Sequence, residues 1–467
     1  NNNQKMRKFY IVLLSLFFAG TCTINAQVDI EDDEDESETE VTVTNKEGKE
    51  EQIELPEAMT YELDSLLYLY NSKTYLRPDS SCDFPDINPQ YTKEEIMARL
   101  KMLPTIIEMP YNDAVQKMID RYSGHLRHSV SFMLGAQNFY MPIFEEALES
   151  YRLPLELKYL PVIESALNPR AVSRVGATGL WQFMISTAKH YGLKVNSLVD
   201  ERRDPLKSSY AAAQYLSDLY KIFGDWNLVI AAYNCGPDKL NRAIHRSGGS
   251  RDYWQIYPYL PAETRGYVPA FIAANYIMNY YCDHNICPML STLPVKTDTV
   301  MLSRDVHFEQ VAGVLGISVD QLRDLNPQYR RNVVNGNNSP MPIRLPVADI
   351  SRFIDNEDSI YAYNADELLT KRDEVDVNDD DVPTVQRVRS YSSSSNKASR
   401  RSKKSGRGKD KSKKKKKKNS GSASITVRSG DTLSEIARRQ HTTVKKLKKL
   451  NGISGSTIRA GKKIKVK

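Results

Sequence analysis

Hydrophobic residues recur at helical spacing from about residue 58 to residue 282, in segments that Gly and Pro separate. The segment "YTKEEIMARLKML" opens with Thr92, and Glu95 three residues later completes the capping-box pattern that begins a helix. The long amphipathic segment "SFMLGAQNFYMPIFEEALESYRL" contains Pro142, which predicts a break or a kink. Strand-like alternation is scarce, so the pattern predicts a mostly helical domain over 58–292, with its core at 100–285.

Beyond residue 292 the pattern changes, and the chain contains an internal repeat. The segment "VAGVLGISVDQLRDLNP" at 311–327 aligns with "IARRQHTTVKKLKKLNG" at 436–452. Leu322, Leu325 and Asn326 of the first copy align with Leu447, Leu450 and Asn451 of the second. A strand-like segment precedes and follows each copy, which predicts two small βααβ modules at 293–348 and 424–467.

The remaining segments are strongly charged. The net charge is +7, from 65 basic and 58 acidic residues, but "DIEDDEDESETE" is acidic and "KKSGRGKDKSKKKKKK" is basic. Blocks of like charge repel and seldom form a core, so we expect 27–57 and 349–423 to be disordered. The lysines Lys413–Lys418 fit either a solvated spacer or contact with an anionic wall or lipid surface. No aromatic residues alternate with them, which disfavours nucleic acid as a partner.

The first 26 residues have the pattern of an export signal. Basic residues around Met6 precede the apolar run "FYIVLLSLFFAG", and "INAQ" supplies a cleavage site after Ala26. Two alternatives stay open, namely a lipid attached to Cys22 and an uncleaved membrane anchor. Because an exported chain can form disulfides, Cys282 and Cys287 in "CDHNIC" are the favoured pair, and free packed thiols are the alternative. No cysteine spacing fits a metal site.

One carboxylate stands out in "PVIESALNPRAVSRVGATGLWQFM". Leu160, Ile163 and Leu167 lie within one helical turn of Glu164, and burial among such residues raises the pKa of a carboxyl group. A carboxyl that keeps its proton near neutral pH can act as a general acid. Pro169 predicts the end of the helix, so Glu164 would lie beside a cleft. A solvent-facing glutamate at the rim of the helix is the alternative.

Further polar and aromatic residues end the apolar segments on either side. Gly179 allows close backbone approach to a ligand, and Trp181 offers a flat face for a sugar ring. Polar groups that converge in an apolar cleft form a ligand site, although helix packing also explains Trp181 and Tyr233. The other candidates are Gly176, Gln182, Asn234, Glu263, Arg265 and Tyr267. The sequence has no GxSxG elbow, HExxH helix or Walker loop.

Together, "IESALNPRAVSRVGATGLWQFM", "AAYNCGP" and "ETRGYVP" resemble the soluble-lytic-transglycosylase (SLT) family, and "VRSGDTLSEIARRQHTTVKKLKKLNG" resembles a LysM domain. The resemblance covers about 100–285 for the SLT part, and 295–346 and 424–467 for the LysM parts. It implies a mostly α, lysozyme-like (goose-type) domain followed by small α+β LysM modules. It also implies cleavage of the β-1,4 bond between N-acetylmuramic acid and N-acetylglucosamine in peptidoglycan, without metal or cofactor, in the periplasm or at the outer membrane or cell wall.

The resemblance also implies roles for individual residues. Glu164 would be the single acid and base, because the C6 hydroxyl of the substrate is the nucleophile and the product is a 1,6-anhydro sugar. The implied substrate-binding residues are Ser173, Gly179, Trp181, Gln182, Tyr233, Asn234 and Tyr267. Glu263 would be structural, pairing with Arg265 or capping a helix. Glycan binding by the last repeat would involve Gly430, Asp431, Thr432 and Asn451.

The sequence departs from the family pattern at two places, and two other functions stay open. Ile185 replaces a proline, and "RDVHFEQ" replaces "SGDTLSE" in the first repeat, so we expect glycan binding mainly in the last repeat. A hydrolytic muramidase on the same fold would need a second carboxylate, for which the nearby candidates are Asp200, Glu201 and Asp204. The third possibility is a non-catalytic peptidoglycan-binding protein.

Overall fold

The computed structural model describes residues 39–44, 48–60, 75–369 and 374–377, and in the last repeat 424–426, 447, 450–451 and 463–465. By contacts, the chain divides into two units at residue 388. The predicted signal peptide, Cys22 and Lys413–Lys418 lie outside the described residues. Among the described residues, no helix has the length and apolar character needed to cross a membrane.

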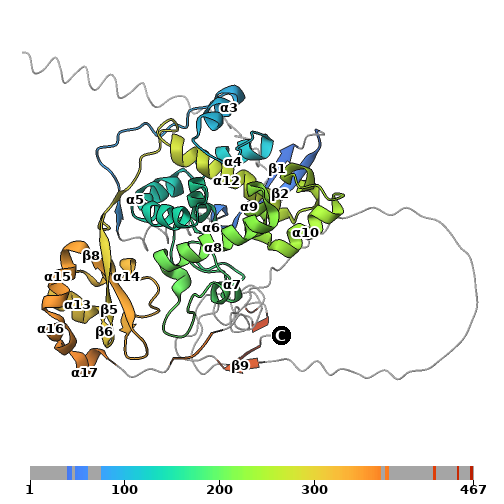
Figure 1. The fold of residues 1–467 in the computed structure, drawn as a ribbon. Helices are drawn as coiled ribbons and strands as arrows, with labels where there is room; N and C mark the ends of the chain where they lie inside the picture. The colour runs from blue at the N-terminus through green and yellow to red at the C-terminus, as the bar shows by residue number, and fades with distance from the viewer. Residues whose placement is uncertain are drawn as a thin grey trace, which may run out of the picture. The chain divides into compact units, whose positions relative to one another are not determined.

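The first domain is helical, as predicted, and is built around one buried helix. Figure 1 shows α12 (Ala262–Tyr280) beside α4, α5, α6 and α9, and nearly every side chain of α12 from Thr264 to Met278 is buried. The other helices are α3 (Lys93–Met102), α4 (Asp113–Ser123), α5 (Arg127–Ser150), η2 (Leu155–Tyr159), α6 (Leu160–Ser165), α7 (Ile185–His190), η3 (Glu201–Arg203), α8 (Pro205–Phe223), α9 (Trp226–Cys235), α10 (Pro237–Arg246), α11 (Tyr253–Ile256) and η4 (Tyr257–Tyr259).

Side-chain caps set several helix boundaries. Thr92 and Glu95 form the predicted capping box at the start of α3. Asp204 accepts hydrogen bonds from the first amides of α8, and Gly224 ends that helix in the left-handed conformation. The sequence predicts a break or a kink at Pro142. The break is wrong, because α5 continues past this residue to Ser150.

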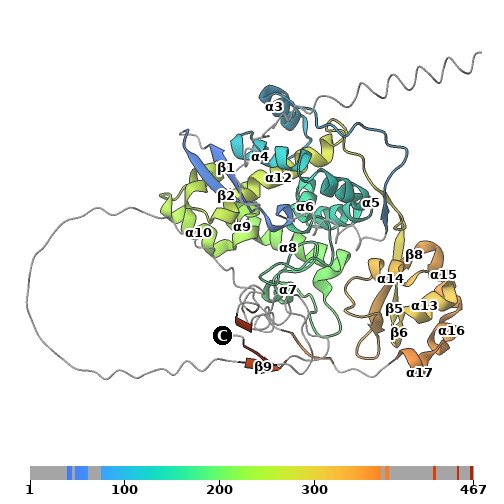
Figure 2. The ribbon, with the colours of Figure 1, turned by 180° about the vertical axis from the view of Figure 1, so that it is seen from behind.

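The N-terminal acidic segment is ordered where the structure describes it, which corrects the prediction of disorder over 27–57. Strands β1 (Glu40–Thr44) and β2 (Glu50–Glu54) form an antiparallel hairpin, followed by the short helix η1 (Glu57–Met59). Figure 2 shows this hairpin against α4 and α12. Its apolar side chains Val43, Ile53, Leu55 and Met59 join the main core. The segment has only a few alternating apolar residues among many charged ones, so its sequence did not predict strands.

The backbone of β2 lies directly on α12. A Cβ atom at Gly266 would lie 2.2 Å from the carbonyl oxygen of Glu54, so only glycine fits at this position. Arg121 donates a hydrogen bond from Nε to the carbonyl of Met59 over 3.0 Å. These contacts make the hairpin and η1 part of the helical domain.

The disulfide joins Cys82 to Cys287, with a Cα–Cα distance of 5.9 Å, and the predicted Cys282–Cys287 bridge is wrong. Cys282 is a free, exposed thiol, and Cys235 is free and half-buried. The bridge fastens the loop before α3 to the segment after α12, near the short pair of strands β3 (Leu76–Arg77) and β4 (Leu290–Ser291). Proximity in sequence was therefore a poor guide, because 205 residues separate the bonded cysteines.

The first repeat folds as a small α+β module with its own core. The outer strands pair in an antiparallel ladder from Thr297↔Pro346 to Leu302↔Met341. A second short antiparallel pair joins Asp305–His307, before the helices, to Val333–Asn335, after them. The elements are β5 (Thr297–Leu302), β6 (Asp305–His307), α13 (Phe308–Leu315), α14 (Val319–Leu325), β7 (Val333–Asn335) and β8 (Met341–Pro346).

The module extends beyond its predicted end at residue 348. Three further helices follow directly, α15 (Val347–Asp355), α16 (Glu357–Ala362) and α17 (Ala365–Leu368). Phe353 and Ile360 are fully buried in the core of the module. The prediction of a disordered linker from 349 is therefore wrong for 349–368, where two apolar residues among many polar ones are enough to hold helices against the module.

The two repeats share one structural device, as their alignment predicts. In the first, the Asn326 amide donates to the carbonyls of Leu322 and Arg344, and its oxygen accepts from the Arg344 amide. In the last, Asn451 makes the same three bonds with Leu447 and Lys465. The Asn451 side chain thus ties a helix to β10 (Lys463–Lys465), which pairs with β9 (Ser424–Thr426). Asn451 therefore has a structural role within the repeat, and its glycan contact stays a prediction.

Candidate active site

Glu164 lies on the last turn of α6, which ends where the sequence predicts. Ala166 and Leu167 adopt left-handed backbone angles, with φ of 48° and 56°, and their amides donate back to the carbonyls of Val162 and Pro161. The neighbouring Ser165 is buried, and its hydroxyl donates to the carbonyl of Leu180 over 2.9 Å. The helix end is therefore fixed from both sides, and the half-buried Glu164 side chain lines a cleft.

The cleft has a volume of about 450 Å³ and contains most of the predicted site residues. Its walls come from η1, α6, the segment 173–187, α8, the junction of α9 with α10, and α12. The side chains with chemical functions that line it are Glu57, Glu164, Ser173, Gln182, Thr187, Tyr215, Tyr233, Asn234, Cys235, Lys239, Glu263 and Tyr267.

Glu164 is held and kept protonated by its surroundings. The pKa of Glu164 is raised to about 8. Burial is the largest cause, the hydrogen bond from Tyr267 opposes it, and the carboxylates of Glu263 and Glu57 add smaller upward shifts. That bond runs from the Tyr267 hydroxyl, on α12, to Oε1 of Glu164. A carboxyl group with this pKa carries its proton at neutral pH, which suits it to donate a proton to a leaving group.

Glu263 and Asn234 form a second polar group in the cleft. Asn234 accepts a hydrogen bond from the Thr264 hydroxyl over 2.8 Å. Burial raises the pKa of Glu263, and a hydrogen bond with Asn234 opposes this shift. The expected pairing of Glu263 with Arg265 is wrong, because Arg265 donates to backbone carbonyls of 258 and 260 and pairs with Glu51 at 3.9 Å.

Tyr233 and the turn 173–182 complete the wall next to Glu164. The Tyr233 hydroxyl donates to the carbonyl of Trp181 over 2.7 Å. Ser173 accepts a hydrogen bond from the Ala177 amide at its hydroxyl oxygen, and Gln182 donates to the carbonyl of Gly179 over 2.7 Å. Gln182 has a φ of 47°, which non-glycine residues rarely adopt and which is often found at functional sites. The turn thus presents Ser173 and Gln182 to the cleft.

Two predicted substrate-binding residues do not reach the cleft. Trp181 is completely buried, its indole nitrogen donates to the Ser209 hydroxyl over 2.9 Å, and its ring packs edge-on against Phe144. It cannot stack on a sugar, so its expected role is wrong. Gly179 has a φ of 89°, and a Cβ atom there would lie 1.9 Å from the carbonyl oxygen of Arg202. Gly179 is thus required for backbone packing rather than for ligand approach.

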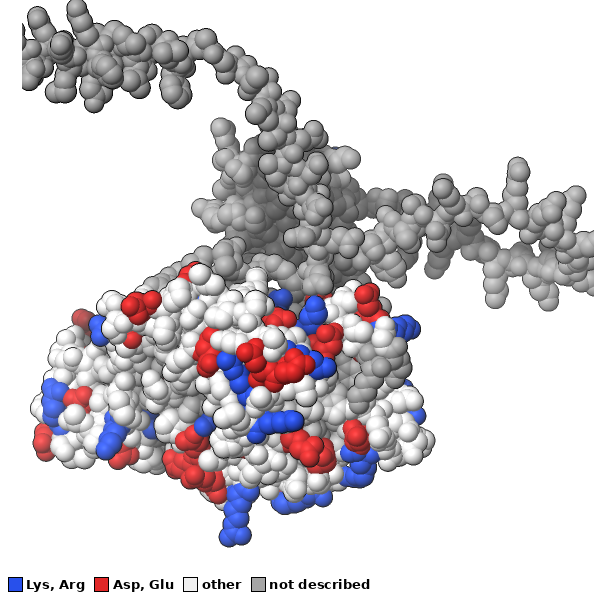
Figure 3. All heavy atoms as spheres, turned by 90° about the horizontal axis from the view of Figure 1, so that it is seen from above, with Lys and Arg blue, Asp and Glu red and all other residues white. Residues whose placement is uncertain are grey.

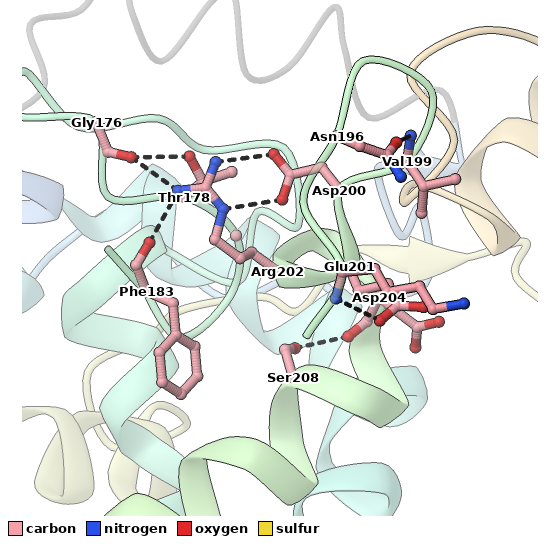
Figure 4. Close-up of polar contacts among 12 residues, drawn as sticks. Gly176, Thr178, Phe183, Asn196, Val199, Asp200, Glu201, Arg202, Asp204 and Ser208 are labelled. Atoms are coloured by element: carbon pink, nitrogen blue, oxygen red, sulfur yellow. Dashed lines mark hydrogen bonds and ion pairs between the residues drawn. The ribbon is translucent and has the colours of Figure 1, made fainter. Parts of the chain in front are cut away.

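The buried side chain of Arg202 fixes this turn through hydrogen bonds to its backbone, as Figure 4 shows. Nη1 of Arg202 donates to the carbonyls of Gly176 and Phe183, each over 3.1 Å. The other side of the guanidinium binds Asp200 at two points, over 2.8 and 2.9 Å. Arg330 of the first repeat also pairs with Asp200 at 3.2 Å. The first repeat is therefore connected to the turn through Arg330, Asp200 and Arg202.

Three carboxylates of the same segment were candidates for the second catalytic group that hydrolysis needs, and all three have other partners. Asp200 is paired with Arg202 and Arg330, and Asp204 caps α8. Glu201 accepts from the Lys194 amide and pairs with Lys207. All three are buried, and none lines the cleft. The carboxylates that do share the cleft with Glu164 are Glu263 and Glu57, and no motif in the sequence pointed to Glu57.

Comparison with known protein families identifies three domains in the chain. The transglycosylase SLT domain matches residues 141–256, the LysM-like domain of lytic transglycosylase MltD matches 296–362, and the LysM domain matches 425–467. The chain therefore contains an SLT domain followed by two LysM-type domains. The predictions of the fold class and of a lytic transglycosylase enzyme are confirmed.

Among individual relatives, membrane-bound lytic murein transglycosylase D of Escherichia coli K12 is 29% identical over 367 residues, covering 77% of this chain and 70% of the relative. Soluble lytic murein transglycosylase of the same strain is 34% identical over 124 residues, covering 25% of this chain and 19% of the relative. The solved structure of the 70 kDa soluble lytic transglycosylase of E. coli is 29% identical over 31% of this chain and 25% of that chain, with a TM-score of 0.27.

Glycan binding is also expected for Gly430, Asp431 and Thr432, which lie outside the described residues. The face of the molecule in Figure 3 carries acidic and basic side chains next to one another.

Proposed function

We propose that this protein is an exported lytic murein transglycosylase that cleaves the β-1,4 bond between N-acetylmuramic acid and N-acetylglucosamine, with Glu164 as its only acid and base. One observation carries the proposal: a carboxyl group with a pKa of about 8, positioned by Tyr267, lines a cleft of about 450 Å³ whose lining residues fall mostly within the SLT match at 141–256.

The reaction needs one proton donor that becomes a proton acceptor. Glu164 gives its proton to the oxygen of the leaving N-acetylglucosamine as the bond to C1 of N-acetylmuramic acid breaks. The C6 hydroxyl of the same N-acetylmuramic acid then attacks C1 and gives its proton to the Glu164 carboxylate. The product is a 1,6-anhydro sugar, Glu164 regains its proton, and no water molecule takes part.

Neighbouring side chains support this cycle. Tyr267 donates its hydrogen bond most strongly to the ionised carboxylate, and so stabilises the state between the two proton transfers. Tyr233, Asn234, Ser173 and Gln182 line the same cleft and offer the hydrogen-bonding groups that hydroxyl and acetamido groups of a glycan require. Pre-organised groups of this kind hold the sugar ring against Glu164.

The LysM domains give the enzyme a second attachment to the wall. A tethered module raises the effective concentration of the catalytic domain at its substrate without changing the chemistry. Removal of 424–467 should therefore weaken binding to sacculi while leaving cleavage of soluble glycan unchanged. The lysines Lys413–Lys418 are proposed to add contact with an anionic wall or membrane surface.

The decisive experiment is mass spectrometry of the muropeptides released from purified sacculi. We expect ends with 1,6-anhydro-N-acetylmuramic acid. Hydrolysis, the alternative, would use Glu263 or Glu57 as a second carboxylate and would release reducing ends. Reducing ends without anhydro forms would therefore replace the transglycosylase by a muramidase, and sacculi left intact would favour a binding protein without catalysis.

A further inference from the structure

The N-terminal segment contributes a carboxylate to the catalytic cleft that the proposed reaction does not use. Helix η1 packs against α6, the helix that carries Glu164. Its first residue, Glu57, follows Pro56, and both residues line the cleft. The Glu57 side chain is 32% exposed, so it lies at the surface of the cleft rather than in the core.

Glu57 also holds the turn that presents Ser173. Oε1 of Glu57 accepts a hydrogen bond from the backbone amide of Arg174 over 3.1 Å, and the Arg174 guanidinium lies 3.7 Å from the same oxygen. Arg174 and Val175 are exposed, so little apolar packing holds the tip of the turn. A charge-assisted bond to a backbone amide is thus an effective anchor for it.

The charge of Glu57 acts on Glu164 together with several other groups. Carboxylates raise the pKa of Glu164 because they oppose its ionisation, and the hydroxyl of Tyr267 has the opposite effect. The titratable or charged groups that line the cleft around Glu164 come from five elements: Glu57 on η1, Tyr215 on α8, Tyr233 and Cys235 on α9, Lys239 on α10, and Glu263 and Tyr267 on α12.

We infer that Glu57 is a positioning residue of the catalytic cleft, which fixes the turn 173–177 through the Arg174 amide and adds a negative charge beside Glu164. The N-terminal hairpin and η1 are then a working part of the active site. The kinetic consequences of this inference rest on the proposed function, whereas the consequence for the turn does not.

Two substitutions separate the two roles. Glu57→Gln removes the charge but keeps an oxygen that can accept from the Arg174 amide. We expect an unchanged KM on soluble glycan and an alkaline limb of the kcat profile shifted to lower pH. Glu57→Ala removes both, so we expect the same shift and a KM raised about five-fold. Glu51→Gln is the matched control, because it removes an ion pair of the same hairpin with Arg265 outside the cleft.

Hydrogen exchange of the Arg174 amide tests the anchor without any activity. Exchange should be faster in Glu57→Ala than in the wild type, and close to the wild type in Glu57→Gln and Glu51→Gln. Equal exchange in all four proteins, or changes in KM and pH profile that Glu51→Gln reproduces, would overturn the inference. A wild-type protein that leaves glycan uncleaved contradicts the proposed function instead, and the exchange rates still decide the role of Glu57.

Discussion

The hydroxyl of Tyr267 donates a hydrogen bond to the carboxyl of Glu164, although 103 residues separate them in the sequence. Tyr267 belongs to the buried central helix α12, and only 1% of its surface is exposed. Glu164 belongs to a helix of six residues. The central helix thus fixes the position of the acid at the end of a short helix, and five predictions follow from this arrangement and from the packing around it.

Glu164→Gln should abolish most of the activity without unfolding the protein. The amide has the same shape and can still accept the hydrogen bond of Tyr267, but it cannot donate and regain a proton. Loss of a general acid and base lowers kcat by about 10²- to 10⁴-fold. The measurement is release of soluble muropeptides from sacculi, with circular dichroism as the check on folding. Wild-type rates would exclude Glu164 as the catalyst.

Tyr267→Phe should lower kcat about ten-fold and move the alkaline limb to higher pH. The tyrosine hydrogen bond favours the ionised carboxylate and lowers the pKa of Glu164, so its loss raises that pKa further. The acid step then suffers, because proton donation leaves a carboxylate that is less stabilised. The limb should move in the direction opposite to that expected for Glu57→Gln. A limb that stays in place would mean that the bond has no influence on the titration of Glu164.

The raised pKa of Glu164 also predicts a pH-dependent stability. The ordinary pKa of a glutamate is 4.5, and burial raises the pKa of Glu164 to about 8, so the folded state binds one more proton between these values. Stability from this group therefore falls as the pH rises from about 4.5 to about 8, and is constant above. Glu164→Gln should remove this fall, and its advantage over the wild type should reach on the order of 3 kcal/mol at pH 8. Urea unfolding at several pH values measures it, and parallel curves would contradict the titration.

Local patterns in the sequence predicted those features that short segments determine. The capping box at Thr92, the end of the helix after Glu164, and the equivalence of Asn326 and Asn451 all depend on neighbours within a few positions. The same holds for the turn that carries Ser173 and Gln182, because glycines and hydrogen bonds within it define its shape.

Features that depend on contacts between distant segments could not be predicted from the sequence. Trp181 looks like a sugar-binding side chain in its motif, but Phe144 and Ser209 from other helices enclose it completely. Glu57 lies 117 residues before Arg174, in a segment whose acidic composition suggested disorder. The cysteine pairing likewise depends on which distant segments meet after folding, here the loop before α3 and the segment after α12. In each of these cases, tertiary packing decided the outcome.

The disulfide can be checked by peptide mapping under non-reducing conditions. We expect Cys82 and Cys287 in one linked peptide pair, and rapid labelling of the exposed Cys282 by a maleimide in the native protein. Replacing both bonded cysteines by serine should lower the stability by about 2–5 kcal/mol, because the bridge closes a long loop in the unfolded chain. Cys282→Ser is the matched control and should be neutral. A linked Cys282–Cys287 peptide would contradict this pairing.

The connection between the first repeat and the turn predicts graded effects at two arginines. Arg202→Met leaves the fully buried Asp200 without its bidentate partner and frees the carbonyls of Gly176 and Phe183. Breaking a buried pair in this way costs about 3–5 kcal/mol, and a looser turn should also raise KM. Arg330→Gln leaves the bidentate pair intact. It removes the outer partner at 3.2 Å and the hydrogen bond from Nε to the Asn196 carbonyl, so we expect a loss of about 1–2 kcal/mol.

Lys221→Gln provides the control for these two variants, because it removes an exposed ion pair with Asp218 that lies away from the cleft. Exposed pairs contribute little, so its unfolding curve and KM should match those of the wild type. Urea unfolding and glycan kinetics of the three variants give the order Arg202→Met, Arg330→Gln, Lys221→Gln from largest to smallest effect. If Arg330→Gln raises KM without any loss of stability, the first repeat influences the turn by a route other than Asp200. If Arg202→Met leaves KM unchanged, the buried guanidinium supports the fold alone and has no part in shaping the wall of the cleft.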